Sequence, residues 1–137
     1  MLQAYLGGIP AFLLYFSGGL GFLAIFGVIY CQVTEHHEIA LLRGGTNQAA
    51  APAFIGALVG FALPVSKSIT QSANFLDFAL WATIALVVQI LAYYAARYLM
   101  TDLTKRIEAN DIWAGVWIGG MAIVFGVINS ASMTYTP

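Results

Sequence analysis

The segment Glu35-His36-His37-Glu38 brings together the side chains of this sequence that are best suited to bind a metal ion. Imidazole nitrogens and carboxylate oxygens are both common zinc ligands. Adjacent residues of a helix point about 100° apart, so the two neighbouring histidines are poorly placed to hold one ion. The metalloprotease pattern His-Glu-x-x-His is also missing. We therefore expect neither a metal site nor any other cofactor.

No other group of residues forms a recognisable catalytic set. The sequence lacks a Ser-His-Asp arrangement, a P-loop glycine run and a dinucleotide-binding fingerprint. It also supplies no nucleophile or general base at a plausible depth in its long hydrophobic segments. We expect that the protein is not an enzyme.

The few charged residues are gathered so tightly that long stretches of the chain carry none. The chain has five Lys or Arg and six Asp or Glu, and its mean hydropathy is +0.85. The uncharged stretches are residues 1–34, 44–66, 78–96 and 112–137. Because roughly 20 apolar residues in a helix cross a bilayer core about 30 Å thick, each stretch can hold one transmembrane helix. We predict an all-α polytopic membrane protein with helices near Pro10–Tyr30, Ala49–Val65, Phe75–Tyr98 and Ile112–Met133.

Composition also limits the partners of the chain. At 14.7 kDa and 61% hydrophobic residues, the chain is expected to form a single transmembrane domain, residues 1–137, with no room for a separate soluble module. The net charge of −1 leaves no basic face for nucleic acid. The lipid bilayer is the expected environment, and helix packing in lipid must supply the core.

An internal repeat divides the chain into two halves. Residues 47–56 align with residues 110–119 at a constant offset of 63, and Asn, Ala, an aromatic residue, Ile and Gly recur in register. Each copy begins a helix that enters from the same side of the membrane, so we predict parallel repeats related by an axis along the membrane normal. The halves, about residues 1–68 and 69–137, are then two helical hairpins packed side by side.

Small residues within the repeat predict close helix packing. Gly56-x-x-x-Gly60 and Gly115-x-x-x-Gly119 form small-x-x-x-small faces, which let helix backbones approach each other in lipid. The sequence leaves open whether these faces close within one subunit or also build an oligomer.

Two polar side chains fall inside the predicted transmembrane helices. Gln89 lies near the middle of the third helix and Asn129 in the outer part of the fourth. Lipid offers such groups no hydrogen-bond partner, so they mark either interhelical hydrogen bonds or a functional point, such as a solute path or a bound headgroup. Both interpretations stay open. No charged residue lies near the midplane, which disfavours a proton-relay pump.

The polar connections at the basic end of the predicted bundle are the candidate surfaces for a partner protein. Residues 34–43 predict a short interfacial helix with Thr34 as its N-cap and glycines at its C-terminus. Asn47 and Asn110 are each predicted to cap the helix that follows. The candidates for partner binding on these connections are Glu38, Arg43, Asn47 and Asn110.

Two further local interactions are predicted from spacing. Asp102 and Arg106 stand at i and i+4, where a helix brings their charges together. Asn74 and Asp77 stand three residues apart, which lets both side chains accept hydrogen bonds from N–H groups at the start of the third transmembrane helix. Both interactions are structural and neither implies a function.

Several of these residues belong to a pattern that extends along the chain. The pattern comprises Thr34, His36, Glu38, Leu42, Asn47, Gly56, Gly60, Leu63 and Pro64, then Ile84-Ala85-Leu86-Val87-Val88-Gln89, Asn110 and Ile128-Asn129-Ser130-Ala131. It resembles the YjfL family of small bacterial inner-membrane proteins. The resemblance covers nearly the whole chain and implies four transmembrane helices, an inner-membrane location and a context of PspA-like envelope-stress systems. It implies no catalytic residues, and the family's biochemical role is unassigned.

Two classes of function fit this sequence. In the first, the protein is a membrane scaffold or accessory subunit, a homo-oligomer or part of a membrane complex, whose loops dock a partner in envelope homeostasis or stress. In the second, a homo-oligomer forms a channel or small-solute transporter around a path lined by Gln89 and Asn129. A wet path would favour more polar residues on one helix face than this sequence has.

The distribution of basic residues predicts the orientation of the chain. The basic residues of the two connections at one end are Arg43, Arg97, Lys105 and Arg106, and Lys67 lies at the other end. The positive-inside rule places the first end in the cytoplasm and both termini outside, in the periplasm. Reporter fusions after Met100 and after Pro137 should therefore report opposite compartments. Cytoplasmic signal from the Pro137 fusion would contradict this orientation.

Overall fold

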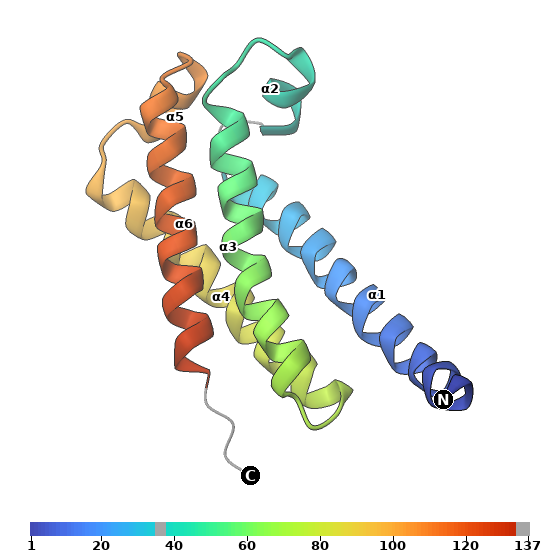
Figure 1. Cartoon of the computed structure of the whole chain (residues 1–137). Helices are drawn as coiled ribbons and strands as arrows, with labels where there is room; N and C mark the ends of the chain where they lie inside the picture. Colours follow the sequence, from blue (N-terminus) through green and yellow to red (C-terminus); the bar gives the residue numbers. More distant parts are fainter. Residues whose placement is uncertain (35–37, 134–137) are drawn as a thin grey trace.

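The computed structural model describes residues 1–34 and 38–133, without the side chain of Glu38. These residues form helices joined by short connections, with no strand among them (Figure 1). The helices are α1 (Leu2–Val33), α2 (Glu38–Gly44), α3 (Ala50–Gln71), α4 (Phe75–Leu99), α5 (Leu103–Glu108) and α6 (Ile112–Ser132). Within the described chain, α1, α3, α4 and α6 are long and apolar enough to cross a membrane. The predicted all-α class with four transmembrane helices is confirmed.

Three of the transmembrane helices begin where the sequence predicts, and the first does not. α3, α4 and α6 start within one residue of the predicted positions. α1 starts at Leu2 and includes Pro10, because the uncharged residues ahead of this proline also suit a helix. α3 continues past Val65 to Gln71, since no helix-breaking residue follows where the apolar span ends.

The centre of the molecule is a close contact between α3 and α6, which run side by side in the same direction (Figure 1). Gly56 and Gly119, which the repeat offset makes equivalent, face each other. A Cβ atom added to Gly56 would lie 2.8 Å from the carbonyl oxygen of Gly119, so no side chain fits there. One turn earlier in α6, a Cβ on Gly115 would overlap the carbonyl group of Ala49.

The same contact continues towards the other end of the two helices. A Cβ on Gly126 would overlap the carbonyl group of Gly60, and one on Gly60 would overlap that of Ala122. In each case the glycine hydrogen that replaces the side chain points at a carbonyl group, which is the geometry of weak Cα–H···O bonds. We call these positions the glycine seam: Gly56, Gly60, Gly115, Gly119 and Gly126.

The glycine seam explains why α3 and α6 associate at all. Lipid tails are as apolar as the helix surfaces, so the hydrophobic effect does not drive helices together within a bilayer. Close packing and hydrogen bonds must therefore hold them together. The seam relates α3 to α6 only, and the arrangement of the two halves as parallel hairpins stays a prediction.

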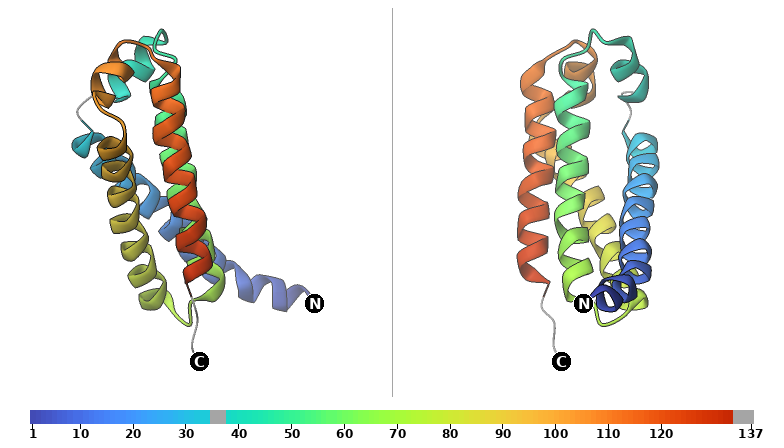
Figure 2. Two further views of the ribbon diagram at one scale, coloured as in Figure 1. Left: turned by 90° about the vertical axis from the view of Figure 1, so that its left-hand side faces the viewer. Right: turned by 45° about the vertical axis from the view of Figure 1, so that its right-hand side comes forward.

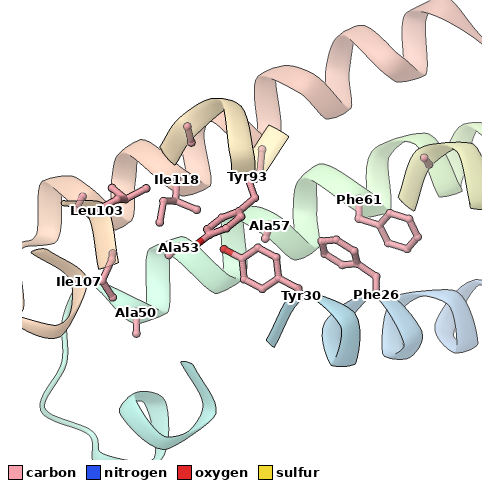
Figure 3. Close-up of a cluster of buried hydrophobic side chains, with 14 of the residues drawn as sticks. Phe26, Tyr30, Ala50, Ala53, Ala57, Phe61, Tyr93, Leu103, Ile107 and Ile118 are labelled. Atoms are coloured by element: carbon pink, nitrogen blue, oxygen red, sulfur yellow. The ribbon is translucent and has the colours of Figure 1, made fainter. Parts of the chain in front are cut away.

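α1 joins the other helices through aromatic rings. Phe26 of α1 stacks on Phe61 of α3 with ring centroids 4.6 Å apart, and Tyr30 of α1 meets Tyr93 of α4 edge to face at 5.8 Å (Figure 3). Towards its N-terminus α1 leaves the bundle, and the end of the helix projects away from α3 and α4 (Figure 2). Every residue from Met1 to Leu14 is exposed, so this part of α1 is not buried against the other helices.

The start of α4 is capped as predicted. Oδ1 of Asn74 accepts a hydrogen bond from the backbone N–H of Asp77 at 2.9 Å. Oδ2 of Asp77 accepts one from the backbone N–H of Ala73 at 3.1 Å. Asn74 therefore satisfies an N–H group of the first turn of α4, as predicted. Asp77 differs from the prediction, because the N–H group that it accepts belongs to Ala73, which precedes the N-cap.

Replacing Gly119 by alanine should lower the free energy of unfolding by about 2 kcal/mol, since the added methyl group would be driven into the α3 backbone. Gly120→Ala is the matched control, because nothing lies within 4 Å of a Cβ at Gly120. Melting curves in detergent measure both variants. Equal shifts for the two would show that the glycine seam does not govern stability.

Candidate functional site

Asn47 ties two connections together at the basic end of the bundle. Its Oδ1 accepts hydrogen bonds from the backbone N–H groups of Ala49 and Ala50, at 2.9 and 2.8 Å. Its Nδ2 donates to the carbonyl oxygen of Ile107 in α5, at 2.8 Å. One side chain therefore caps the start of α3, as predicted, and fixes α5 beside it.

Asn110 differs from the prediction that it caps α6. It has a left-handed φ of 65°, and its Oδ1 accepts a hydrogen bond from the backbone N–H of Gln48 in the other connection. The cap of α6 is Asp111, whose Oδ1 accepts from the N–H of Trp113 at 3.1 Å. The capping prediction for Asn110 is wrong, because the turn after α5 places a left-handed residue one position ahead of the cap. We call Asn47 and Asn110, whose side chains cross between the two connections, the asparagine clasp.

An ion pair stands beside the asparagine clasp. Nε of Arg106 donates to Oδ2 of Asp111 at 2.7 Å. The predicted pairing of Arg106 with Asp102 is wrong, because Asp102 precedes α5 with a left-handed φ of 56° and lies outside helical geometry. The hydrogen bond from Arg106 and its charge hold the pKa of Asp111 below the usual range. The carboxylate that caps α6 is therefore charged at neutral pH.

The end of the first connection agrees with the prediction, and its beginning is described only as far as Thr34. Thr34 follows α1 as its C-cap, and its hydroxyl donates to the carbonyl oxygen of Tyr30 at 3.0 Å. Its predicted capping of α2 stays a prediction, because residues 35–37 lie between the two. α2 ends at Gly44 as predicted, and Gly45 takes a left-handed φ of 69°. Residues 35–37, with both histidines, and the side chain of Glu38 lie outside the described part. The predictions for them stay predictions.

Gln89 lies where α4 meets the glycine seam. Its side chain is 2% exposed, and its Nε2 donates to the carbonyl oxygen of Ala122 in α6 at 3.1 Å. Its Oε1 faces Gly60 of α3 and has no hydrogen-bond partner within the described residues. One amide thus contacts both helices of the seam from a third.

Asn129 lies further along α6, in the lining of a groove that does not include Gln89. It lines a groove of about 330 Å³ together with Val88 of α4 and Phe125 and Ile128 of α6, and Gln89 is not part of this lining. The Nδ2 atom of Asn129 is buried and has no hydrogen-bond partner among residues 1–34 and 38–133.

Two residues take part in this region without having been singled out from the sequence. Asp111 caps α6, and the only signal was its place directly before the predicted helix. Trp117 of α6 donates from Nε1 to the carbonyl oxygen of Ala96 near the end of α4, at 3.0 Å. The repeat aligns Trp117 with Phe54, which marks an aromatic position but not a hydrogen bond.

These features define a class: small polytopic membrane proteins whose helices are joined by backbone packing and by a buried amide. The chain belongs to the family described as Domain of Unknown Function (DUF350), whose family model matches residues 4–133. It is similar to the UPF0719 inner membrane protein YjfL of Escherichia coli strain K12 and of strain O157:H7. It is 35% identical to each over 130 residues, which is 95% of this chain and 98% of the relative. No solved structure matches the chain.

The comparison confirms the resemblance to the YjfL family that the sequence pattern indicated. With its long apolar helices, the chain is an inner membrane protein with membrane-spanning helices. The family description assigns no activity.

Asn47→Ala should destabilise the protein more than Asn110→Gly. The first change removes the α3 cap and the bond to Ile107, at a cost of about 1.5 kcal/mol. The second keeps the left-handed backbone and removes only the bond from Gln48, at a cost of about 1 kcal/mol or less. Melting curves together with hydrogen exchange at residues 47–50 measure the difference. A larger loss for Asn110→Gly would show that Asn47 does not organise the clasp.

Proposed function

We propose that the protein is a non-enzymatic scaffold or accessory subunit of the inner membrane that works as a homo-oligomer or within a membrane complex. The observation that carries this proposal is the burial of Gln89 inside one subunit, where it is 2% exposed and donates to Ala122. A polar side chain that joins helices in this way is not available to line a solute path between subunits.

The glycine seam supports the same proposal. The backbones of α3 and α6 are in contact from Gly115 to Gly126, so a path along this line would have to separate the two helices. Separation would forfeit the packing contacts that hold them together in lipid. A bundle closed in this manner is better suited to hold partners than to conduct a solute.

The asparagine clasp supplies a firm surface for a partner at the basic end. It links the starts of α3 and α6 through α5, so the two connections move as one unit. Arg43 is exposed on α2 and stays a candidate for partner contact. Asn47 uses both atoms of its amide in the clasp, and Asn110 uses its Oδ1. By the positive-inside rule this surface faces the cytoplasm. A role in envelope homeostasis or stress rests on the family resemblance.

A channel or small-solute transporter is the alternative, and one observation favours it. Asn129 has a buried Nδ2 without a hydrogen-bond partner in the described residues, beside a groove on the bundle surface. Several subunits meeting at this groove would bring such amides together.

Gln89→Leu separates the two functions. If Gln89 joins helices, the variant should lose about 1 kcal/mol of stability or less and stay assembled, since the unfolded chain in the membrane also finds partners for a glutamine. The purified full chain, reconstituted in proteoliposomes, should release potassium and chloride no faster than empty vesicles. Thr83→Val is the control. Thr83 is exposed on the same helix, and its hydroxyl donates to the carbonyl oxygen of Ala79, one turn earlier in α4.

Flux and mass measurements give opposite outcomes for the two functions. Wild-type efflux well above empty vesicles, abolished by Gln89→Leu or Asn129→Leu in a protein that is still assembled, would replace the scaffold by a channel. Native mass spectrometry in nanodiscs tests the assembly itself. A monomer at every protein density, with no co-purifying membrane protein, would overturn the proposed oligomer or complex.

A further inference from the structure

A groove of about 410 Å³ runs between α1 and α3 at the end of the bundle that carries α2. Its walls include Leu23, Gly27 and Cys31 of α1, Phe54 and Leu58 of α3, and Ile39 of α2. Among the described side chains, the lining includes no charged or amide group. We call it the α1–α3 groove, and its volume lies in the range of about 300–1,000 Å³ that is usual for ligand clefts.

The α1–α3 groove opens sideways to the bilayer. Leu20, Val28 and Ile39 form its rim and are 53%, 59% and 49% exposed. The space exists because α1 crosses α3 at an incline (Figure 1) and carries two small residues, Ala24 and Gly27, among the larger ones that line it. If the groove were empty, the side chains that line it would lose dispersion contacts. In a membrane it is therefore occupied by an apolar group.

The length of the groove corresponds to one leaflet. Its lining on α1 extends from Leu20 to Cys31, which is about 16 Å along a helix. Half of a hydrocarbon core about 30 Å thick is about 15 Å. An acyl chain of the leaflet at the basic end would therefore extend from the interface to the bilayer midplane inside this groove.

The interfacial end of the groove carries a positive charge. Arg43 stands at i+4 from Ile39 on α2, so both residues lie on one face of this short helix. Arg43 is exposed and forms no ion pair with any residue of the described chain. A guanidinium at this level suits a phosphate, which it can bind through two parallel hydrogen bonds.

We propose that the α1–α3 groove binds one phospholipid, with an acyl chain along Leu23, Gly27 and Leu58 and its phosphate at Arg43. The apolar walls, the length of one leaflet and the exposed Arg43 at the interfacial end all fit this occupant. A helix from a second copy fits less well, because a helix about 10 Å wide would need a wider opening than the space left by one small-residue face. The proposal does not depend on the scaffold function.

Glycines of α1 provide a matched pair of variants. A Cβ at Gly27 lies 4.0 Å from the nearest atom, the ring of Phe54, so Gly27→Leu fills the groove without a backbone clash. Gly21→Leu is the control, because Gly21 lies on the same helix outside the groove, with nothing within 4 Å of a Cβ. Ala24→Leu fills the groove at a second position. Melting curves verify that each variant is folded.

Binding is measured by native mass spectrometry of the full chain in detergent, titrated with palmitoyl-oleoyl phosphatidylglycerol and separately with the corresponding diacylglycerol. The wild type and Gly21→Leu should each bind one phosphatidylglycerol per chain with the same affinity. Gly27→Leu and Ala24→Leu should weaken this binding at least tenfold. Arg43→Gln should weaken the binding of phosphatidylglycerol several-fold and leave the binding of diacylglycerol unchanged.

Three outcomes would overturn the proposal. Equal phosphatidylglycerol affinity for Gly27→Leu, Ala24→Leu and the wild type would show that the groove is not the site. An equal loss of affinity for both lipids in Arg43→Gln would show that Arg43 does not bind the phosphate. A change of oligomeric mass in Gly27→Leu without a change in lipid binding would assign the groove to a second copy of the chain.

Discussion

The contact between the backbones of α3 and α6 is the constraint on which the other contacts depend. Helices with ordinary side chains pack about 8–10 Å apart, and glycines bring these two closer together. Because the seam is narrow, one amide from α4 reaches both helices, with Nε2 of Gln89 at Ala122 and its Oε1 facing Gly60. The parallel direction also places both helix starts side by side, which is what allows the asparagine clasp to form.

Much of the fold could be predicted because lipid makes sequence signals simple. Uncharged stretches of sufficient length predict transmembrane helices, and three of the four starts were right within one residue. The early start of α1 could not be predicted, since hydropathy does not distinguish residues that span a bilayer from equally apolar residues that extend beyond the bundle. The end of α3 was missed for a related reason, because a helix does not need to stop where hydropathy falls.

The details of the candidate site depended on tertiary geometry. The position of Gln89 could be predicted, but its partner could not, because the rotation of α4 about its axis decides which carbonyl the amide meets. Asn110 was misassigned because a left-handed residue ahead of Asp111 is a property of the turn and not of the residue type. Arg106 likewise pairs with Asp111 because α5 begins after Asp102, a boundary that spacing alone does not locate.

The inclination of α1 gives the molecule a different breadth at its two ends. α1 has 32 residues, or about 48 Å, while α6 has 21, or about 32 Å. The projecting N-terminal part lies at the same end as the close of α6, so the ribbon spreads further at that end than at the other (Figure 2). A membrane protein of this shape occupies a larger area in one leaflet than in the other. Its free energy in the bilayer therefore depends on membrane curvature, which changes the area available in each leaflet.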